Sequence, residues 1–94
     1  MAVFWRSGNA TVWVEYRGDT LAFYGLDRGY RDGGDYEYVI SVASAEFDAV
    51  RRALGGGPDA DVVELVCERV DQIMPRGERT WLDEHGIAYE FTGY

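Results

Sequence analysis

The sequence holds one cysteine, Cys67, and one histidine, His85, the two side chains best suited to nucleophilic and general-base chemistry near neutral pH. A catalytic pair would need these two to meet, with a third group to orient the base. Helical periodicity instead places Cys67 at the flank of an apolar stripe, where a free cysteine is usually a small buried hydrophobe. His85 precedes Gly86 at the expected end of a short helix, a position that favours histidine through the helix dipole. We therefore expect no enzyme.

A metal site or a phosphate-binding loop is not indicated either. One cysteine and one histidine are too few for a zinc site, and the three aspartates in residues 27–35 are interrupted by two arginines, unlike a calcium loop. The glycines at 55–57 precede an expected helix, but the lysine of a P-loop is missing, and Asp59 and Asp61 would repel phosphate. We expect no metal and no cofactor, and interpret the glycines as a linker between helices.

The charge of the chain narrows the class of partner. Its formal net charge is -8, and all nine basic residues are arginine. Such a surface repels nucleic-acid phosphates and anionic membranes and favours a basic protein. With one cysteine no intramolecular disulfide forms, residues 1–6 do not begin a signal peptide, and no apolar stretch approaches the ~18 residues of a membrane span. We expect a cytoplasmic protein with a protein partner.

Four carboxylates on one arc of an expected helix form the first candidate binding surface. They lie opposite an apolar arc that includes Val62, Val66 and Ile73. The same pattern is typical of an ordinary solvated helix face, whereas a functional interpretation is a docking strip for a basic partner. We call this set the acidic ridge; its members are Asp61, Glu64, Glu68 and Asp71.

The second candidate surface is the glycine-rich and charged segment at residues 27–35, which the sequence predicts to be a surface loop. Tyrosine and arginine are common anchors of protein interfaces. A solvated hairpin loop is the plainer interpretation. The proposed contact residues in this segment are Asp27, Arg28, Tyr30, Arg31, Asp32 and Asp35.

The elements that carry these surfaces follow from a change of hydrophobic period along the chain. The first half alternates with period 2 between turn signals, and the second half follows the helical period until a final alternating segment. Ser44 is expected to cap the first helix, Gly55 to end it, Pro75 to stop the second, and a capping box at Thr80 to start the third. The expected strands are 3–6, 11–16, 20–26, 36–43 and 87–91, and the expected helices are 44–54, about 59–74 and about 80–86.

Strands followed by helices predict an α+β fold. We expect a single domain over residues 1–94, with a mostly antiparallel sheet of about five strands and two longer helices and one short helix packed on one face. The place of the last strand, at an edge or in the middle, stays open. Large aromatic residues are expected to build the core: Trp5, Trp13, Phe23, Tyr24, Trp81 and Phe91.

Four segments together resemble small acidic proteins of high-GC bacteria that are encoded beside polymorphic toxins and act as immunity proteins. These segments are Phe23-Tyr-Gly-Leu-Asp-Arg-Gly29, Tyr36-Glu-Tyr38, Ala53-Leu-Gly55 and Trp81-Leu-Asp-Glu-His-Gly-Ile-Ala-Tyr-Glu-Phe91. The resemblance implies a protein that binds a cognate toxin domain and blocks its active site or substrate groove. Many such toxins are nucleases with basic grooves, which an acidic ridge would complement in charge. No individual binding residue is transferred.

Three other functions stay open. The chain is alternatively an acidic nucleic-acid mimic or regulatory protein that blocks a DNA-binding partner. It is also compatible with a small enzyme that uses His85 or Cys67, or with a homo-oligomeric module whose strand edge pairs with itself. The sequence leaves the oligomeric state and the identity of the partner open.

Overall fold

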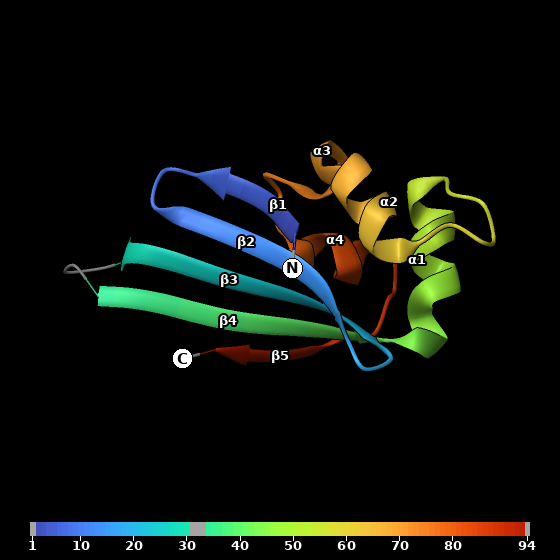
Figure 1. The fold of residues 1–94 in the computed structure, drawn as a ribbon, viewed down its shortest axis with the longest axis horizontal. Coiled ribbons are helices and arrows are strands. Elements are labelled where there is room, and N and C mark those ends of the chain that lie inside the picture. The colour runs from blue at the N-terminus through green and yellow to red at the C-terminus, as the bar shows by residue number, and fades with distance from the viewer. Residues whose placement is uncertain (1, 31–33, 94) are drawn as a thin grey trace.

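A computed structural model describes residues 2–30 and 34–93 of the chain. Its centre is an antiparallel sheet in which each strand lies beside the one that precedes it, in the order β1-β2-β3-β4-β5 (Figure 1). The last strand therefore occupies an edge, beside β4. The strands are β1 (Ala2–Ser7), β2 (Ala10–Arg17), β3 (Thr20–Tyr30), β4 (Gly34–Ala43) and β5 (Glu90–Gly93).

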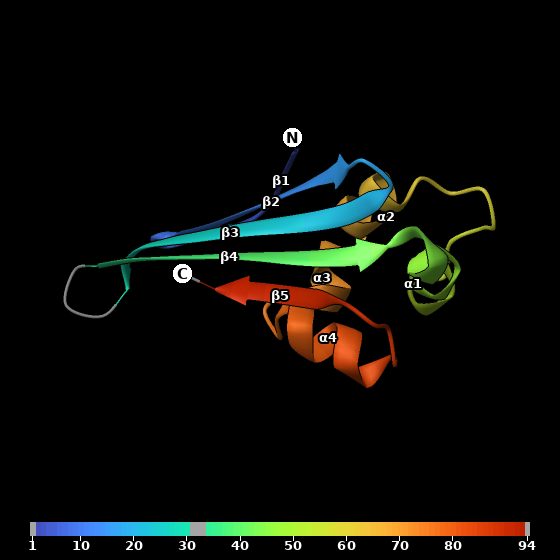
Figure 2. The same ribbon diagram turned by 90° about the horizontal axis from the view of Figure 1, so that it is seen from below.

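The helices lie together over one end of this sheet, while the hairpin of β3 and β4 extends beyond them at the other end (Figures 1 and 2). This arrangement confirms the α+β prediction. No helix within the described ranges is long and apolar enough to cross a membrane. The helical elements are the short 3₁₀ turn η1 (Ser44–Glu46), α1 (Phe47–Leu54), α2 (Val62–Glu68), α3 (Val70–Ile73) and α4 (Glu78–Glu84).

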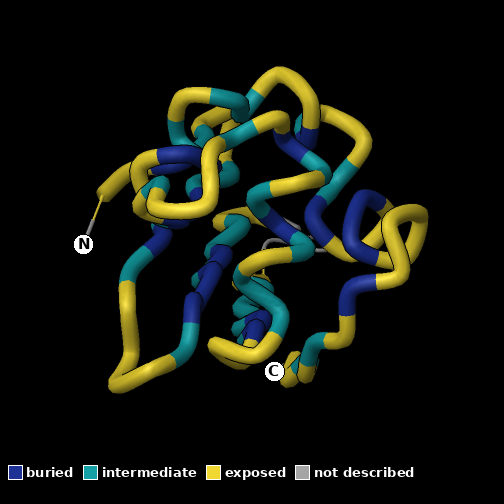
Figure 3. The backbone as a smooth tube through the Cα atoms, turned by 90° about the vertical axis from the view of Figure 1, so that its right-hand side faces the viewer, coloured by how far each residue is buried: buried dark blue, intermediate teal, exposed yellow. Residues whose placement is uncertain are grey.

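The strand alternation defines which face of the sheet the helices cover. Successive side chains of a strand point to opposite faces, and cross-strand partners share a face. Val14 pairs with Phe23, which in turn pairs with Ile40, and all three are buried. They form one hydrophobic cluster with buried residues of every long helix, including Val50, Val66 and Trp81. Figure 3 shows the same separation along the chain, with exposed turns around a buried interior.

Two of the aromatic residues expected in the core lie on the opposite face of the sheet. Trp13 and Tyr24 are cross-strand partners, half-buried, with ring centroids 5.6 Å apart. Trp13 precedes the buried Val14, and Tyr24 follows the buried Phe23. Because successive side chains of a strand point to opposite faces, both rings point away from the helices. The placement of Phe23 and Trp81 in the core is confirmed, and Trp5 and Phe91 pack against it while half-buried.

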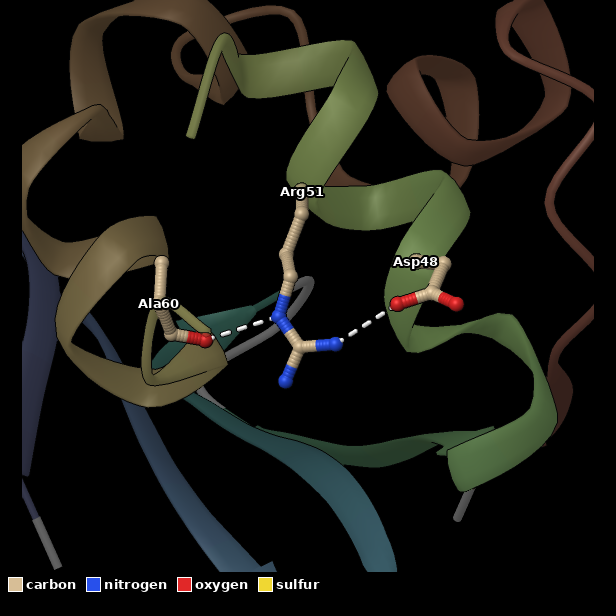
Figure 4. A network of polar contacts seen from close by, with 3 residues as sticks. All are labelled: Asp48, Arg51 and Ala60. Carbon is tan, nitrogen blue, oxygen red and sulfur yellow. Dashed lines mark hydrogen bonds and ion pairs between the residues drawn. The ribbon is translucent and has the colours of Figure 1, made fainter. Parts of the chain in front are cut away.

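The first helix starts later than the sequence indicates and ends where it indicates. Ser44 makes no side-chain cap and belongs to η1, so α1 begins at Phe47. The helix ends at Gly55, whose φ of 75° is the left-handed conformation that glycine adopts without strain. Arg51 of α1 then fixes the glycine linker from one side. Its guanidinium donates to the carbonyl of Ala60 and to Asp48, both at 2.8 Å (Figure 4).

The single helix expected over about 59–74 is two helices. Arg69 departs from helical geometry, with φ −108° and ψ 27°, and separates α2 from α3. Its Nε donates to the carbonyl of Leu54 at 3.4 Å, at the C-terminal end of α1. This contact joins residues 15 positions apart, so the local periodicity that predicts one helix contains no sign of it.

The last helix and strand are also shifted. The prediction of a capping box at Thr80 is wrong, because α4 begins at Glu78, after Gly77, and Thr80 lies inside this helix. Gly86, with φ 66°, follows the helix end as predicted. The residues from Ile87 to Tyr89 do not belong to the strand, which begins only at Glu90. The backbone N–H of Ile87 instead bonds to the carbonyl of Leu82 at 3.0 Å, which keeps the chain close to the helix end.

Candidate functional site

All four carboxylates of the acidic ridge are exposed, and one of them, Asp61, also has a structural role. Asp61 is the N-cap of α2: its Oδ1 accepts the backbone N–H of Glu64 at 3.1 Å and the hydroxyl of Tyr16 at 2.8 Å. These two bonds hold the pKa of Asp61 below its usual value, the backbone bond contributing most. Glu64 and Glu68 lie on α2 and Asp71 on α3, all exposed. The ridge is thus a strip of carboxylates across the break between two helices.

The segment 27–35 is mostly strand, not the predicted loop. Residues 27–30 complete β3, and Gly34 and Asp35 begin β4, which extends the hairpin. Arg28 and Asp35 are cross-strand partners and both are exposed, whereas Asp27 is half-buried. The strand is favoured here because the backbone N–H of Arg28 also donates to the carbonyl of Asn9 at 3.0 Å. The local composition does not reveal this contact.

Two of the proposed contact residues, Arg31 and Asp32, lie outside the described residues, and Tyr30 is placed only as the end of β3. The described part of the hairpin end lies away from the helices, on the long axis of a molecule that measures 44 × 25 × 22 Å. The acidic ridge lies on α2 and α3, which belong to the helices at the other end of the molecule (Figures 1 and 2). The structure therefore does not bring the two candidate surfaces together.

A third feature, which the sequence did not indicate, is a shallow pocket of about 250 Å³ between the sheet edge and α4. We call it the Glu78 pocket. The side chain of Glu78 is only 5% exposed, and its Oε1 accepts the hydroxyl of Tyr38 at 2.9 Å. None of the ion pairs among the described residues includes Glu78. The other main residues that line the Glu78 pocket are Tyr36, Arg79 and Phe91.

Burial sets the electrostatics of this pair. Desolvation raises the pKa of Glu78 above its usual value, against a smaller opposing effect of its own backbone N–H and of the Tyr38 hydroxyl. Desolvation is also the first cause that raises the pKa of Tyr38, followed by the negative charge of Glu78. Tyr38 is therefore a hydrogen-bond donor to Glu78 throughout the physiological pH range.

Aromatic rings form the wall of the pocket. The ring of Tyr38 stacks on Phe91 with centroids 6.0 Å apart and an angle of 23°, and Tyr36 lies 6.0 Å from Tyr38. The guanidinium of Arg79 lies 4.1 Å from the centroid of Phe91. Gly25 faces Tyr38 across the sheet, and a Cβ at position 25 would overlap its ring. The sequence signal for this close approach is an isolated glycine inside a strand, directly after Phe23 and Tyr24.

The two side chains best suited to catalysis, Cys67 and His85, pack against other parts of the fold. Cys67 is half-buried on α2 and packs against the core, and burial raises the pKa of its thiol, which disfavours the reactive thiolate. His85 is the C-cap residue of α4, with its ring 4.9 Å from that of Trp81. Within residues 2–30 and 34–93, no group of three or more histidine, cysteine, aspartate or glutamate side chains is arranged to hold a metal ion.

Comparison with known proteins adds no relative. No protein-family model matches the chain, and neither a curated protein nor a solved structure matches it. The resemblance to immunity proteins therefore stays a prediction.

Proposed function

We propose that this chain is an immunity protein that binds a toxin domain and neutralises it by covering its active site or substrate groove. The observation that supports this function most is the strip of exposed carboxylates Glu64, Glu68 and Asp71 over α2 and α3, in a chain of net charge -8. A strip of one sign of charge attracts a surface of the opposite sign and orients it before contact.

Exposure is what makes these carboxylates suited to recognition. An exposed charge keeps its hydration until the partner arrives, and it acts over about 8 Å at physiological ionic strength. Asp61 is also exposed, but its oxygen is already engaged by Tyr16 and by the backbone of α2. In this proposal Glu64, Glu68 and Asp71 steer the partner, and Asp61 holds the helix that presents them.

The exposed residues of the 27–35 segment stay a second contact surface in this proposal. Arg28 and Asp35 face solvent at the far end of the β3–β4 hairpin. Since this end lies apart from the ridge, it contacts either a different part of the same toxin domain or a different partner. We expect a substitution there to change the dissociation rate of the complex more than its association rate.

The test uses the protein encoded by the neighbouring gene, purified as its toxic domain. Reversing two ridge charges, Glu64→Arg with Glu68→Arg, should slow association about tenfold or more at low salt and less at high salt, because steering is screened by ions. The matched control is Asp19→Arg with Glu90→Arg, which changes the net charge equally at exposed sites outside the ridge. Stopped-flow fluorescence measures both variants.

Two results would count against the proposal. If the toxic domain does not bind the unmodified chain, the immunity function is wrong. If both double variants slow association equally, net charge alone acts and the ridge is not the docking strip.

The same strip of carboxylates also suits an acidic mimic of nucleic acid that occupies the groove of a DNA-binding protein. Gene context separates the two functions, since a toxin gene favours the first and a phage or restriction locus the second. A competition experiment adds a direct readout, because a mimic displaces DNA from its partner and an inhibitor of a toxin with another substrate does not.

A further inference from the structure

The carboxylate of Glu78 is buried without a positive partner among the described residues. It is 5% exposed, and its polar contacts are the Tyr38 hydroxyl at 2.9 Å and its own backbone N–H. A carboxylate accepts about four hydrogen bonds, so Tyr38 supplies only part of what water would. A buried charge of this kind is unfavourable unless a counter-charge reaches it.

The walls beside Glu78 have the chemistry that attracts a cation. The Tyr38 and Phe91 rings, which stack on each other, both line the pocket, and aromatic rings attract guanidinium and ammonium groups. The chain already uses one of these rings in this way, because the guanidinium of Arg79 lies 4.1 Å from the Phe91 centroid. The Arg79 side chain is hydrogen-bonded to Tyr89, and none of the ion pairs among the described residues joins it to Glu78.

We propose that the Glu78 pocket receives an arginine side chain of the partner protein, with its guanidinium against the Tyr38 and Phe91 rings and bonded to the Glu78 carboxylate. This proposal rests on the protein-binding function above and names an anchor that the acidic ridge does not supply. A planar guanidinium both stacks on rings and forms paired hydrogen bonds with a carboxylate, which a lysine ammonium cannot do together. The incoming cation supplies the counter-charge that the folded chain alone lacks.

The roles of three neighbouring residues follow from this geometry. Tyr38 positions the carboxylate through its hydroxyl, and Gly25 leaves room for the Tyr38 ring to lie across β3. Arg79 has the charge of the incoming group and lies on the same Phe91 ring, so it competes with the partner's arginine for that face. Removing its charge should therefore strengthen binding.

The test uses a capped tripeptide, acetyl-Gly-Arg-Gly-amide, and a matched peptide in which citrulline replaces arginine. Citrulline keeps the shape and loses the charge. We expect the arginine peptide to shift the backbone amide signals of Glu78 and Phe91 in a saturable manner, and the citrulline peptide to bind about tenfold more weakly, because a hydrogen bond to a charged group is the stronger kind.

Two variants of the chain sharpen the result. Glu78→Gln keeps an acceptor for the Tyr38 hydroxyl and removes the charge, so it should fold and lose the preference for arginine over citrulline. Arg79→Gln should bind the arginine peptide about twofold to fivefold more tightly, since a competing exposed cation–π contact is worth about 0.5–1 kcal/mol. The Tyr38 ring signals of each variant report whether the pocket is intact.

The proposal is overturned if the citrulline peptide binds as well as the arginine peptide, if Glu78→Gln binds both peptides as the unmodified chain does, or if no saturable shift develops at about 10 mM peptide. Because the peptides replace the partner, this experiment needs no toxin domain. Its failure therefore leaves the immunity function standing, and failure of toxin binding leaves the pocket's preference for arginine standing.

Discussion

The two faces of the sheet are built from similar residues and have different roles. On the covered face, Val14 and Phe23 are buried against the helices. On the open face, their chain neighbours Trp13 and Tyr24 are half-buried and pack on each other. Large aromatic residues therefore lie on both faces, and the residue type does not reveal which face the helices cover. What separates the faces is burial by elements that come later in the chain.

The same contrast separates the carboxylates. Glu64, Glu68 and Asp71 are exposed and keep their water, so their charge is available to a distant partner. Glu78 lies on the covered side, where desolvation raises its pKa and a counter-charge would be favourable. Exposed carboxylates suit steering, whereas a buried carboxylate beside aromatic rings suits an anchor.

The largest effect should come from truncating one residue on each face. Phe23→Ala leaves a cavity in the core and should lower the free energy of unfolding by about 3–5 kcal/mol. Its chain neighbour on the open face is the matched control, and Tyr24→Ala should lower it by about 1 kcal/mol, the value of a cross-strand pair. Urea denaturation measures both. Equal losses would contradict the contrast between the faces.

Gly25→Ala tests the close packing on the covered face. The added methyl group overlaps the Tyr38 ring, which Phe91 and Glu78 hold in place, so stability should fall by about 1–3 kcal/mol. Gly57→Ala is the control, because a Cβ there meets open space, and its effect should be within about 0.5 kcal/mol. If the two variants are equally stable, the Tyr38 ring is free to move and does not define the pocket wall.

Asp61→Ala separates the structural member of the ridge from the others. It removes both the helix cap and the acceptor of Tyr16, and should cost about 1–2 kcal/mol. Glu64→Ala, on the exposed part of the same helix, should change stability by less than about 0.5 kcal/mol. Thermal or urea unfolding distinguishes them, and a large loss for Glu64→Ala would show that Glu64 also holds the helix in place.

Glu78→Gln should change the free energy of unfolding by a smaller amount, which depends on pH. Since burial raises the pKa of Glu78 above its unfolded value, the folded state binds a proton more tightly, and the stability it contributes is lost as pH rises from about 4 through the raised pKa. Glutamine cannot ionise, so the variant should gain stability relative to the unmodified chain over that range. Urea unfolding at a series of pH values measures the difference.

The control for the pH experiment is Glu64→Gln at the exposed ridge. It removes one negative charge at an exposed site, so it corrects for the general effect of losing a charge. If the stability difference of Glu78→Gln follows that of Glu64→Gln at every pH, water reaches the Glu78 carboxylate freely and the pocket has no need of a counter-charge.

Much of the local structure could be predicted from the sequence. Strand alternation places Tyr38 and Ile40 on one face of β4 and Val39 on the other, as the register shows. Gly55 ends α1 because glycine adopts a positive φ without strain. The exposure of Glu64, Glu68 and Asp71 also follows from helical periodicity. Each of these features depends on residues within a few positions of one another.

Only the tertiary structure decided the features that depend on distant contacts. Three features involve partners from other elements. They are the break at Arg69, the extension of β3 and β4 through most of 27–35, and the placement of Trp13 away from the core. The Glu78 pocket is the clearest case, since it joins Tyr38, Glu78 and Phe91 from three separate elements. Burial is a property of the packed chain, and it is burial that makes Glu78 differ from the other acidic residues that the structure describes.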